Sequence, residues 1–229
     1  TLLVDGDMRT NDPDIYAVGD CALVTNRVTG QRQWSAMGST ANITGRLAAT
    51  RIAGETGPSY PGVLGTGVAK LPGVSMGRTG LTEAAAKKAG FNVETIVVAA
   101  DDKAHYYPGS EKMMMKLICD RDTHKLLGMQ ALGNWAVDKM TDIAVTAISM
   151  GAALEELQSC DFAYAPPFST AIHPFAVAVN ALLNKLSGKL ESFTPAQYAA
   201  GEAEDYTMLD VSIQPAFQNV PHIQLNQVN

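Results

Sequence analysis

Two tyrosines lie beside prolines, where a stiff backbone would hold each phenol at a defined place. Tyr106 belongs to the stretch Tyr-Tyr-Pro-Gly, and Tyr164 to the segment Asp161–Phe168, which reads DFAYAPPF. Each proline fixes φ at about −65° and removes a backbone donor, and Ala165 is kept out of the α region. We therefore expect a stiff, extended arm. A phenol on such an arm can donate a hydrogen bond or a proton to a reacting atom; the alternative is that Tyr164 packs at a loop–helix joint.

The pair Gly19-Asp20 is a second candidate, because it follows a short apolar run. Asp12-Pro13-Asp14 has the chemistry of a turn, and Ile15–Val18 then predicts a buried strand that stops at the glycine. A strand that ends in Gly-Asp can bring backbone close to a ligand and direct a carboxylate at it. On these residues alone, a strand followed by a turn is the simpler explanation.

The sulfur-containing residues indicate no metal site. Cys21, Cys119 and Cys160 share no CxxC and no metal-ligand spacing, so we predict free thiols in a reducing cytoplasm. Three consecutive methionines at 113–115 suggest a soft metal, but successive strand residues face opposite ways, and we interpret them as core packing.

The composition excludes several function classes. Hydrophobic residues make up 46% of the 229 residues and the net charge is −6, which is typical of an acidic globular protein with no basic patch for nucleic acid. No apolar run reaches the ~20 residues that a membrane span needs. The chain begins at Thr1 and opens directly on the strand-like run Leu2–Val4. We expect a fragment of a longer protein.

A helix is expected next to the Gly19-Asp20 pair. Apolar residues at helical spacing predict a helix over Thr40–Ile52, with Ile43, Leu47, Ala48 and Ile52 on its buried face. Ser39 or Thr40 is a suitable N-cap, and Gly54 can end the helix. Asn42 and Arg46 lie one turn apart on another face.

The remaining elements form an α+β pattern, an antiparallel sheet with helices on one side. The residues predict a strand at 68–80 broken near Pro72-Gly73, a helix at 83–89 capped by Thr82, a strand at 92–100, a hairpin of 113–119 and 125–132, and helices at 137–151 and 174–186, the last with His173 as a poor N-cap. We divide the chain into residues 1–55, a linker at 56–66, a second domain at 67–188, and a tail at 189–229.

The segment Thr10–Asp20 resembles the second flavin fingerprint of the FAD-dependent pyridine nucleotide–disulfide oxidoreductases. This resemblance implies that Asp20, after Gly19, hydrogen-bonds the ribityl chain of FAD. It also implies that the helix N-terminus at Gly38 and Ser39 faces the flavin pyrimidine ring, where free N–H groups suit the electron-rich end of a reduced flavin.

The same resemblance turns Asn42 and Arg46 toward substrate, although a solvated helix face remains the alternative for Arg46. Cys21 lies just past the fingerprint and does not match the redox cysteine of the family.

The second domain resembles the dimerisation domain of the coenzyme A-disulfide reductase and NADH oxidase branch. Five pieces carry this resemblance in order and spacing: GLTEAAAKKAGF, YYPGSEKMMMKL, LLGMQALG, VDKMTDIAVTAI and AYAPPFS. The branch usually has Lys-Asp before the proline of the last helix, where this chain has Ile172-His173. The lysine is expected to help to bind coenzyme A, so the departure bears on that substrate.

The tail at Phe193–Ser212 resembles the opening of a rhodanese domain, with a helical start and a strand at Tyr206–Val211. His222–Asn229 would correspond to the next rhodanese strand. The persulfide cysteine loop of rhodaneses does not occur in this sequence.

The resemblance implies an intact flavoprotein that passes electrons from NAD(P)H through FAD to a disulfide, CoA-disulfide or persulfide/polysulfide. This chain would supply homodimerisation and one wall of the FAD and substrate site, with Tyr106 and Tyr164 reaching across the dimer. The hairpin at 113–132 and the helix at 174–186 carry more apolar surface than one small domain needs, so we expect both at the dimer interface. It has no G-x-G-x-x-G, so we expect the chain alone to bind no FAD and to be inactive. The alternatives are an inactive homodimerising module, an NADH oxidase acting on O2, and a sulfurtransferase.

Overall fold

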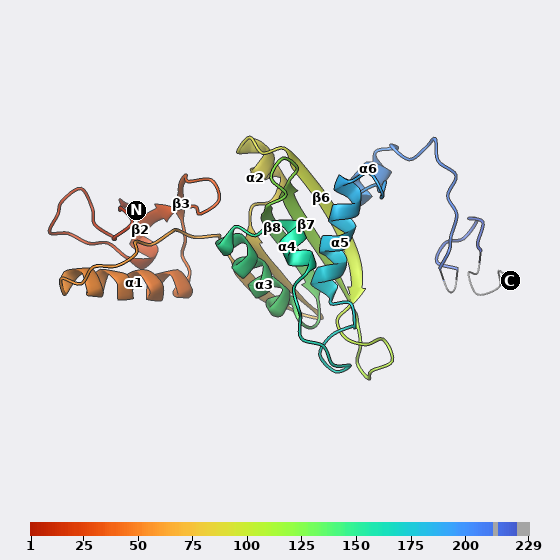
Figure 1. Cartoon of the computed structure of the whole chain (residues 1–229), viewed down its shortest axis with the longest axis horizontal. Coiled ribbons are helices and arrows are strands. Elements are labelled where there is room, and N and C mark those ends of the chain that lie inside the picture. The colour runs from red at the N-terminus through yellow and green to blue at the C-terminus, as the bar shows by residue number, and fades with distance from the viewer. Residues whose placement is uncertain (213–214, 224–229) are drawn as a thin grey trace. The chain divides into compact units, whose positions relative to one another are not determined.

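The computed structural model describes residues 1–212 and 215–223, and it divides into two compact units, Thr1–Leu190 and Glu191–Asn229 (Figure 1). The first unit holds a three-stranded sheet in the order β1-β2-β3 and a five-stranded sheet in the order β4-β5-β8-β7-β6. The second unit contains one short helix.

The small sheet carries the Gly19-Asp20 pair. β1 (Leu2–Leu3) pairs in parallel with β2 (Ala22–Thr25), which pairs antiparallel with β3 (Arg32–Trp34). The strand predicted at 15–18 is wrong: only a single bridge joins Arg9 to Tyr16. The turn at residues 12–14 reverses the direction of the chain immediately, because Thr10 N–H donates to the Ile15 carbonyl at 2.9 Å. The paired segments are therefore too short to form a regular β-ladder.

Helix α1 (Gly38–Ile52) begins two residues earlier than predicted, after Met37, and no side chain caps it. Its buried residues are Thr40, Thr44 and Ala48, whereas Ile43 and Ile52 are 53% and 67% exposed. The predicted apolar face was therefore wrong for Ile43 and Ile52, whereas Ala48 is buried as predicted and Leu47 packs partly buried against the same core. The helix packs its small residues against the turn at Gly19, where backbone comes too close for a large side chain.

The large sheet has the predicted antiparallel arrangement. Its strands are β4 (Gly67–Leu71), β5 (Val74–Gly80), β6 (Val93–Asp101), β7 (Lys112–Asp120) and β8 (Leu126–Gly133). The predicted break at Pro72-Gly73 is the turn between β4 and β5, and Gly73 has the positive φ of 76° that such a turn favours.

Three helices cover one face of this sheet (Figure 1): α3 (Val137–Met150), α4 (Leu154–Gln158) and α5 (Pro174–Leu186). The core between them includes Met113, Met115, Leu117, Met129, Met140, Phe175, Val179 and Leu182. α2 (Glu83–Lys88), capped by Thr82 as predicted, packs on the opposite face at one end, where Ala86 meets Ile118 and Leu127.

The prediction that all three methionines at 113–115 pack in the core holds for two of them. Met113 and Met115 are fully buried, but Met114 is 46% exposed. Alternation along β7 places Met114 on the face that the three helices do not cover.

Gly128 is expected to tolerate no side chain. A Cβ at this position would lie 1.9 Å from the Leu81 carbonyl oxygen and 2.9 Å from Leu81 N, so the backbone would have to move. We expect Gly128→Ala to lower the free energy of unfolding by about 3 kcal/mol or more in urea denaturation. Gly67→Ala is the control, because nothing lies within 4 Å of its added Cβ; equal effects of the two changes would contradict the steric argument.

The second unit shows part of what its sequence predicts. α6 (Pro195–Ala199) starts at a capping box of Thr194 and Gln197, which is the predicted helical start. The strand predicted at 206–211 is wrong, since only Asp210 bridges to His222. Instead, the Asp210 carboxylate accepts backbone N–H groups from Ser212, Ala216 and Phe217, which closes a loop. Most of the strand predicted at 222–229 lies outside the described residues.

Candidate functional site

The Gly19-Asp20 pair forms a tight turn against α1. Gly19 is buried with φ of 66°, and its N–H donates to Thr44 Oγ1 at 3.2 Å. A Cβ on Gly19 would lie 3.3 Å from that of Ala41, so glycine lets the turn approach the helix. Asp20 is exposed, and its carbonyl accepts from the Trp34 indole at 2.8 Å. The Gly19-Asp20 turn thus packs on the first turns of α1 and leaves Asp20 exposed.

The start of α1 is suited to an electron-rich group. Gly38 and Ser39 are exposed, and no side chain caps the first turn. Its free N–H groups and the helix dipole favour negative charge. Asn42 lies in the same turn, and its Nδ2 donates to the Gly38 carbonyl at 2.8 Å. Arg46 follows one turn further along the helix.

The buried Asp102 carboxylate holds the loop that carries Tyr106. This carboxylate is 3% exposed; it accepts from Glu111 N–H at 2.9 Å and pairs with Lys103 at 3.3 Å. The loop is tied to the other tyrosine segment, since Ala104 N–H donates to the Pro166 carbonyl at 3.2 Å.

The segment with Tyr164 is extended only as far as Ala165. The prolines do not prolong the arm but start a turn, in which the Ala165 carbonyl accepts N–H groups from Phe168 and Ser169 at 2.9 and 3.1 Å. A φ of about −65° suits turns as well as extended chain, so the residue types alone do not choose between them. Tyr164 is 53% exposed and therefore does not pack at a joint within this chain.

The structure brings Tyr106 and Tyr164 together. Tyr106 is 67% exposed, and its pKa is raised by partial desolvation and then by the neighbouring Tyr164 phenol. The Tyr106 hydroxyl therefore stays protonated and can donate. No hydrogen bond or ion pair among the described residues joins these tyrosines to Asp20 or to the start of α1.

His173 is buried where α5 begins, below the tyrosine segment. It is 4% exposed, stacks on Phe162 with ring centroids 4.5 Å apart, and accepts the Phe175 N–H on Nδ1 at 3.2 Å. The predicted N-cap of α5 at His173 is thus confirmed, with the imidazole Nδ1 as the acceptor. The proton sits on Nε2, which has no partner among the described residues. Burial, and then the charge of Lys139, lower the pKa of His173 from 6.5 to about 4.

His173 should make folding sensitive to acid. Because the folded state holds the neutral ring, its contribution to stability is complete above pH 6.5 and is lost as the pH falls toward 4. We expect the free energy of unfolding of the natural chain to fall by about 2 kcal/mol more than that of His173→Asn over this range. Asparagine keeps a good N-cap without the titration. Parallel pH profiles in urea denaturation would contradict this assignment.

The cysteines are free thiols, as predicted, and they differ in exposure. Cys119 is buried, and desolvation followed by the charge of Glu94 raises its pKa to about 12, which makes it inert. Cys21 and Cys160 are exposed. Each of these two thiols contacts a backbone carbonyl, and neither bonds to a base among the described residues.

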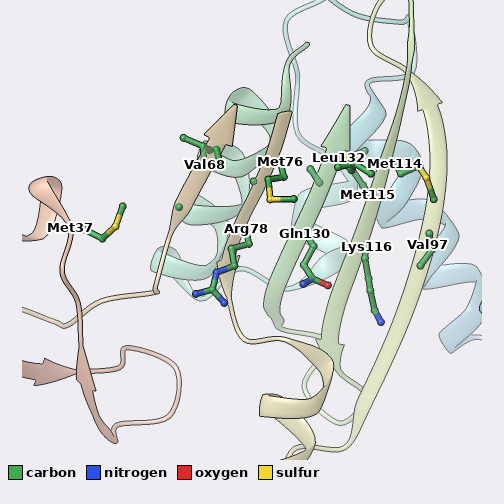
Figure 2. Close-up of a pocket in the computed structure, with 14 residues that line it drawn as sticks. Met37, Val68, Met76, Arg78, Val97, Met114, Met115, Lys116, Gln130 and Leu132 are labelled. Carbon is green, nitrogen blue, oxygen red and sulfur yellow. The ribbon is translucent and has the colours of Figure 1, made fainter. Parts of the chain in front are cut away.

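The sequence interpretation expected the hairpin at 113–132 to contribute to a dimer interface, but it did not single out the sheet face that α3, α4 and α5 leave uncovered. Figure 2 shows Met76, Leu132 and Met114 side by side across β5, β8 and β7, with Arg78, Gln130 and Lys116 in a polar row beside them. The three apolar side chains are 41–46% exposed and line a groove of about 550 Å³. The period-two pattern of β7 is the signal that could have found this face.

This chain is similar to several oxidoreductases. Residues 70–176 match the family model described as "Pyridine nucleotide-disulphide oxidoreductase, dimerisation domain". A curated "NAD(P)H sulfur oxidoreductase (CoA-dependent)" of Pyrococcus furiosus is 37% identical over 175 residues, which are 76% of this chain and 39% of that protein.

Two solved structures share the fold. A NAD-dependent persulfide reductase from A. fulgidus matches with a TM-score of 0.89 and 33% identity, over 100% of this chain and 43% of that one. Reduced CoADR-RHD of Bacillus anthracis matches with a TM-score of 0.89 and 32% identity, over 99% and 42%. The chain thus spans about two fifths of the length of these relatives.

The match to the family model covers β5, β6, β7, β8, α3 and α4, together with the loops that carry both tyrosines. It therefore includes the sheet with the uncovered face and the helices that form its core. Residues 70–176 of this chain are therefore similar to the dimerisation domain of the pyridine nucleotide-disulphide oxidoreductases.

Proposed function

We propose that this chain is part of a flavoprotein that passes electrons from NAD(P)H through FAD to a disulfide, CoA-disulfide or persulfide/polysulfide. The observation that carries the proposal is the agreement over the whole chain with the A. fulgidus persulfide reductase, at a TM-score of 0.89. Within the proposed flavoprotein, residues 1–55 end the FAD-binding domain, residues 56–66 link it to the next domain, and residues 67–188 form the dimerisation domain.

The residues near Gly19 fit one edge of a flavin. FAD, when bound, accepts a hydride and delivers electrons to sulfur. Asp20 would hold the ribityl chain, and the free N–H groups at Gly38 and Ser39 would lie against the pyrimidine ring. Gly19 packs closely on Ala41, since an added Cβ would lie 3.3 Å from the Ala41 Cβ. A turn without a side chain at this point would leave space for the flat ring of the flavin. Asn42 and Arg46 would face the substrate.

The uncovered sheet face is the surface on which we propose homodimerisation. The cross-strand row of Met76, Leu132 and Met114 is too apolar to remain in water at this size. The sequence interpretation also counted α5 toward the interface, but its Phe175, Val179 and Leu182 are fully buried in the core of the same chain. The dimer surface is therefore assigned to the sheet.

The tyrosine pair would act on sulfur across that dimer. Tyr164 presents a hydroxyl that can donate a hydrogen bond to a sulfur anion or a proton to a leaving thiolate. The Tyr106 phenol lies beside it and would help to position it. His173 beneath the segment stays neutral at physiological pH and adds no positive charge.

The proposal also covers the tail at residues 189–229 and a location in the cytoplasm. We propose that residues 189–229 lead into a rhodanese-like domain, which is supported by the match of CoADR-RHD to 99% of this chain and by the predicted start at α6. Three free cysteines support a reducing cytoplasm. None of the described helices is long and apolar enough to cross a membrane.

The proposed activity can be tested with the intact enzyme and with this chain alone. The intact enzyme is expected to show a flavin absorption spectrum and to oxidise NAD(P)H with polysulfide or CoA-disulfide faster than with O2. The 229-residue chain is expected to retain no FAD, because one wall offers too few contacts to offset the immobilisation of the cofactor. An intact enzyme without flavin, or one that consumes only O2, would contradict the proposal.

A further inference from the structure

A polar pocket of about 370 Å³ lies where the β2–β3 hairpin meets the β5–α2 connection. Its lining includes three basic residues from separate elements, Arg32 from β3, Arg78 from β5 and Lys88 from α2, of which Arg78 also lines the groove on the uncovered sheet face. Neutral donors, Thr29, Gln31, Gln33 and Thr82, fill the space between them, and no carboxylate lines the pocket among the described residues.

Hydrogen bonds fix the backbone on two sides of this pocket. Asn26 is 8% exposed; its Oδ1 accepts the N–H groups of Val28 and Thr29, each at 2.9 Å, and its Nδ2 donates to Gln33 Oε1 at 2.5 Å. On the other side, the Leu64 carbonyl accepts from Gly80 N–H at 2.9 Å. The hairpin wall and the β5 wall are therefore preformed.

The charge of the pocket is not compensated within the chain. Among the described residues, no carboxylate lies within ion-pair distance of Arg32, Arg78 or Lys88. Arg32 Nη1 donates to the Val4 carbonyl at 2.6 Å, and Val4 does not line the pocket, so the charge available to an occupant comes from Arg78 and Lys88. Two cations without a carboxylate partner, in a chain of net charge −6, favour an anionic occupant.

We propose that this pocket binds a small polyanion of the phosphate class, as inorganic pyrophosphate or as the diphosphate of a nucleotide. The Arg78 guanidinium offers paired N–H donors that match phosphate oxygens, and Lys88 adds a point charge. The volume of about 370 Å³ lies within the range of small-ligand sites. The proposal needs neither FAD nor the reduction of a disulfide.

Calorimetric titration of the full chain with inorganic pyrophosphate tests this, at an ionic strength held constant with NaCl. Arg78→Gln and Lys88→Gln are each expected to weaken binding by about tenfold. Lys87→Gln is the matched control, because Lys87 lies next to Lys88 on α2 but pairs with Glu83 at 2.6 Å and does not line the pocket. It should leave the affinity within about twofold.

The titrations distinguish a nucleotide ligand from an inorganic one, and two results would contradict the proposal. ADP that binds more tightly than pyrophosphate would support a nucleotide as the ligand, and equal affinities would support an inorganic one. No heat with pyrophosphate at about 10 mM, where even a millimolar Kd would be seen, would overturn the proposal. An equal loss in Lys87→Gln and Lys88→Gln would also overturn it, because attraction to general surface charge would then explain the binding.

Discussion

Replacing Tyr164 with phenylalanine in the intact enzyme is expected to slow NAD(P)H-dependent reduction by about 10²-fold, the low end of what a general acid contributes. The phenol is 53% exposed and is held by a turn that begins at Pro166. Loss of the hydroxyl removes a donor to sulfur while leaving the ring in place. Steady-state turnover with saturating substrate measures the effect.

Three controls distinguish this role from packing. FAD content, dimer mass and the melting temperature should not change in Tyr164→Phe. Tyr106→Phe should have a weaker effect, because Tyr106 acts through Tyr164 and neighbouring Tyr107 can replace part of its function. Tyr198→Phe removes a hydroxyl from a tyrosine of similar exposure, 55%, on α6 and should leave turnover unchanged. Normal turnover in Tyr164→Phe with a lower melting temperature would assign this residue to packing.

A lysine at Leu132 is expected to dissociate the proposed dimer. Leu132 lies at the centre of the apolar row, between Met76 and Met114 (Figure 2), and is 41% exposed in the single chain. An obligate interface of this kind buries upwards of about 2,000 Å². An unpaired charge inside it costs about 3–5 kcal/mol, so the dimer Kd should rise by at least about 10²-fold. Light scattering at micromolar concentration measures it.

The matched control places the same charge on the other side of the domain. Met150 on α3 is 74% exposed, and Met150→Lys should leave both dimer mass and folding unchanged. Circular dichroism must show that Leu132→Lys is still folded. If the natural chain is itself a monomer, or if both variants remain dimers, the uncovered sheet face is not the interface.

Local residue patterns predicted most of the large domain. Turn residues such as Pro72-Gly73, the cap at Thr82 and the alternating strands are local signals, each settled by the residues within a few positions of it. They predicted the antiparallel sheet, with β4 and β5 as one broken strand, and the start of α5 at Pro174. The same segments carry the family resemblance, whereas the roles of the two tyrosines stay predictions.

The tertiary structure decided which faces are buried and which groups meet. Periodicity assigned Ile43 to the buried face of α1, but the backbone turn at Gly19 packs on Thr44 instead. Alternation along β7 was visible, yet only the helices on one side of the sheet show that Met114 faces outward.

The pocket lined by Arg32, Arg78 and Lys88 also depends on the tertiary structure. Arg32 is far in the sequence from Arg78 and Lys88, and the three residues belong to no motif. They line one pocket because the backbone of Val63 bonds to the hairpin and that of Leu64 bonds to Gly80 at the end of β5. Local residue patterns determine elements, because capping and turn energies act over a few residues. The juxtaposition of elements depends on packing between distant segments, which a single sequence does not display.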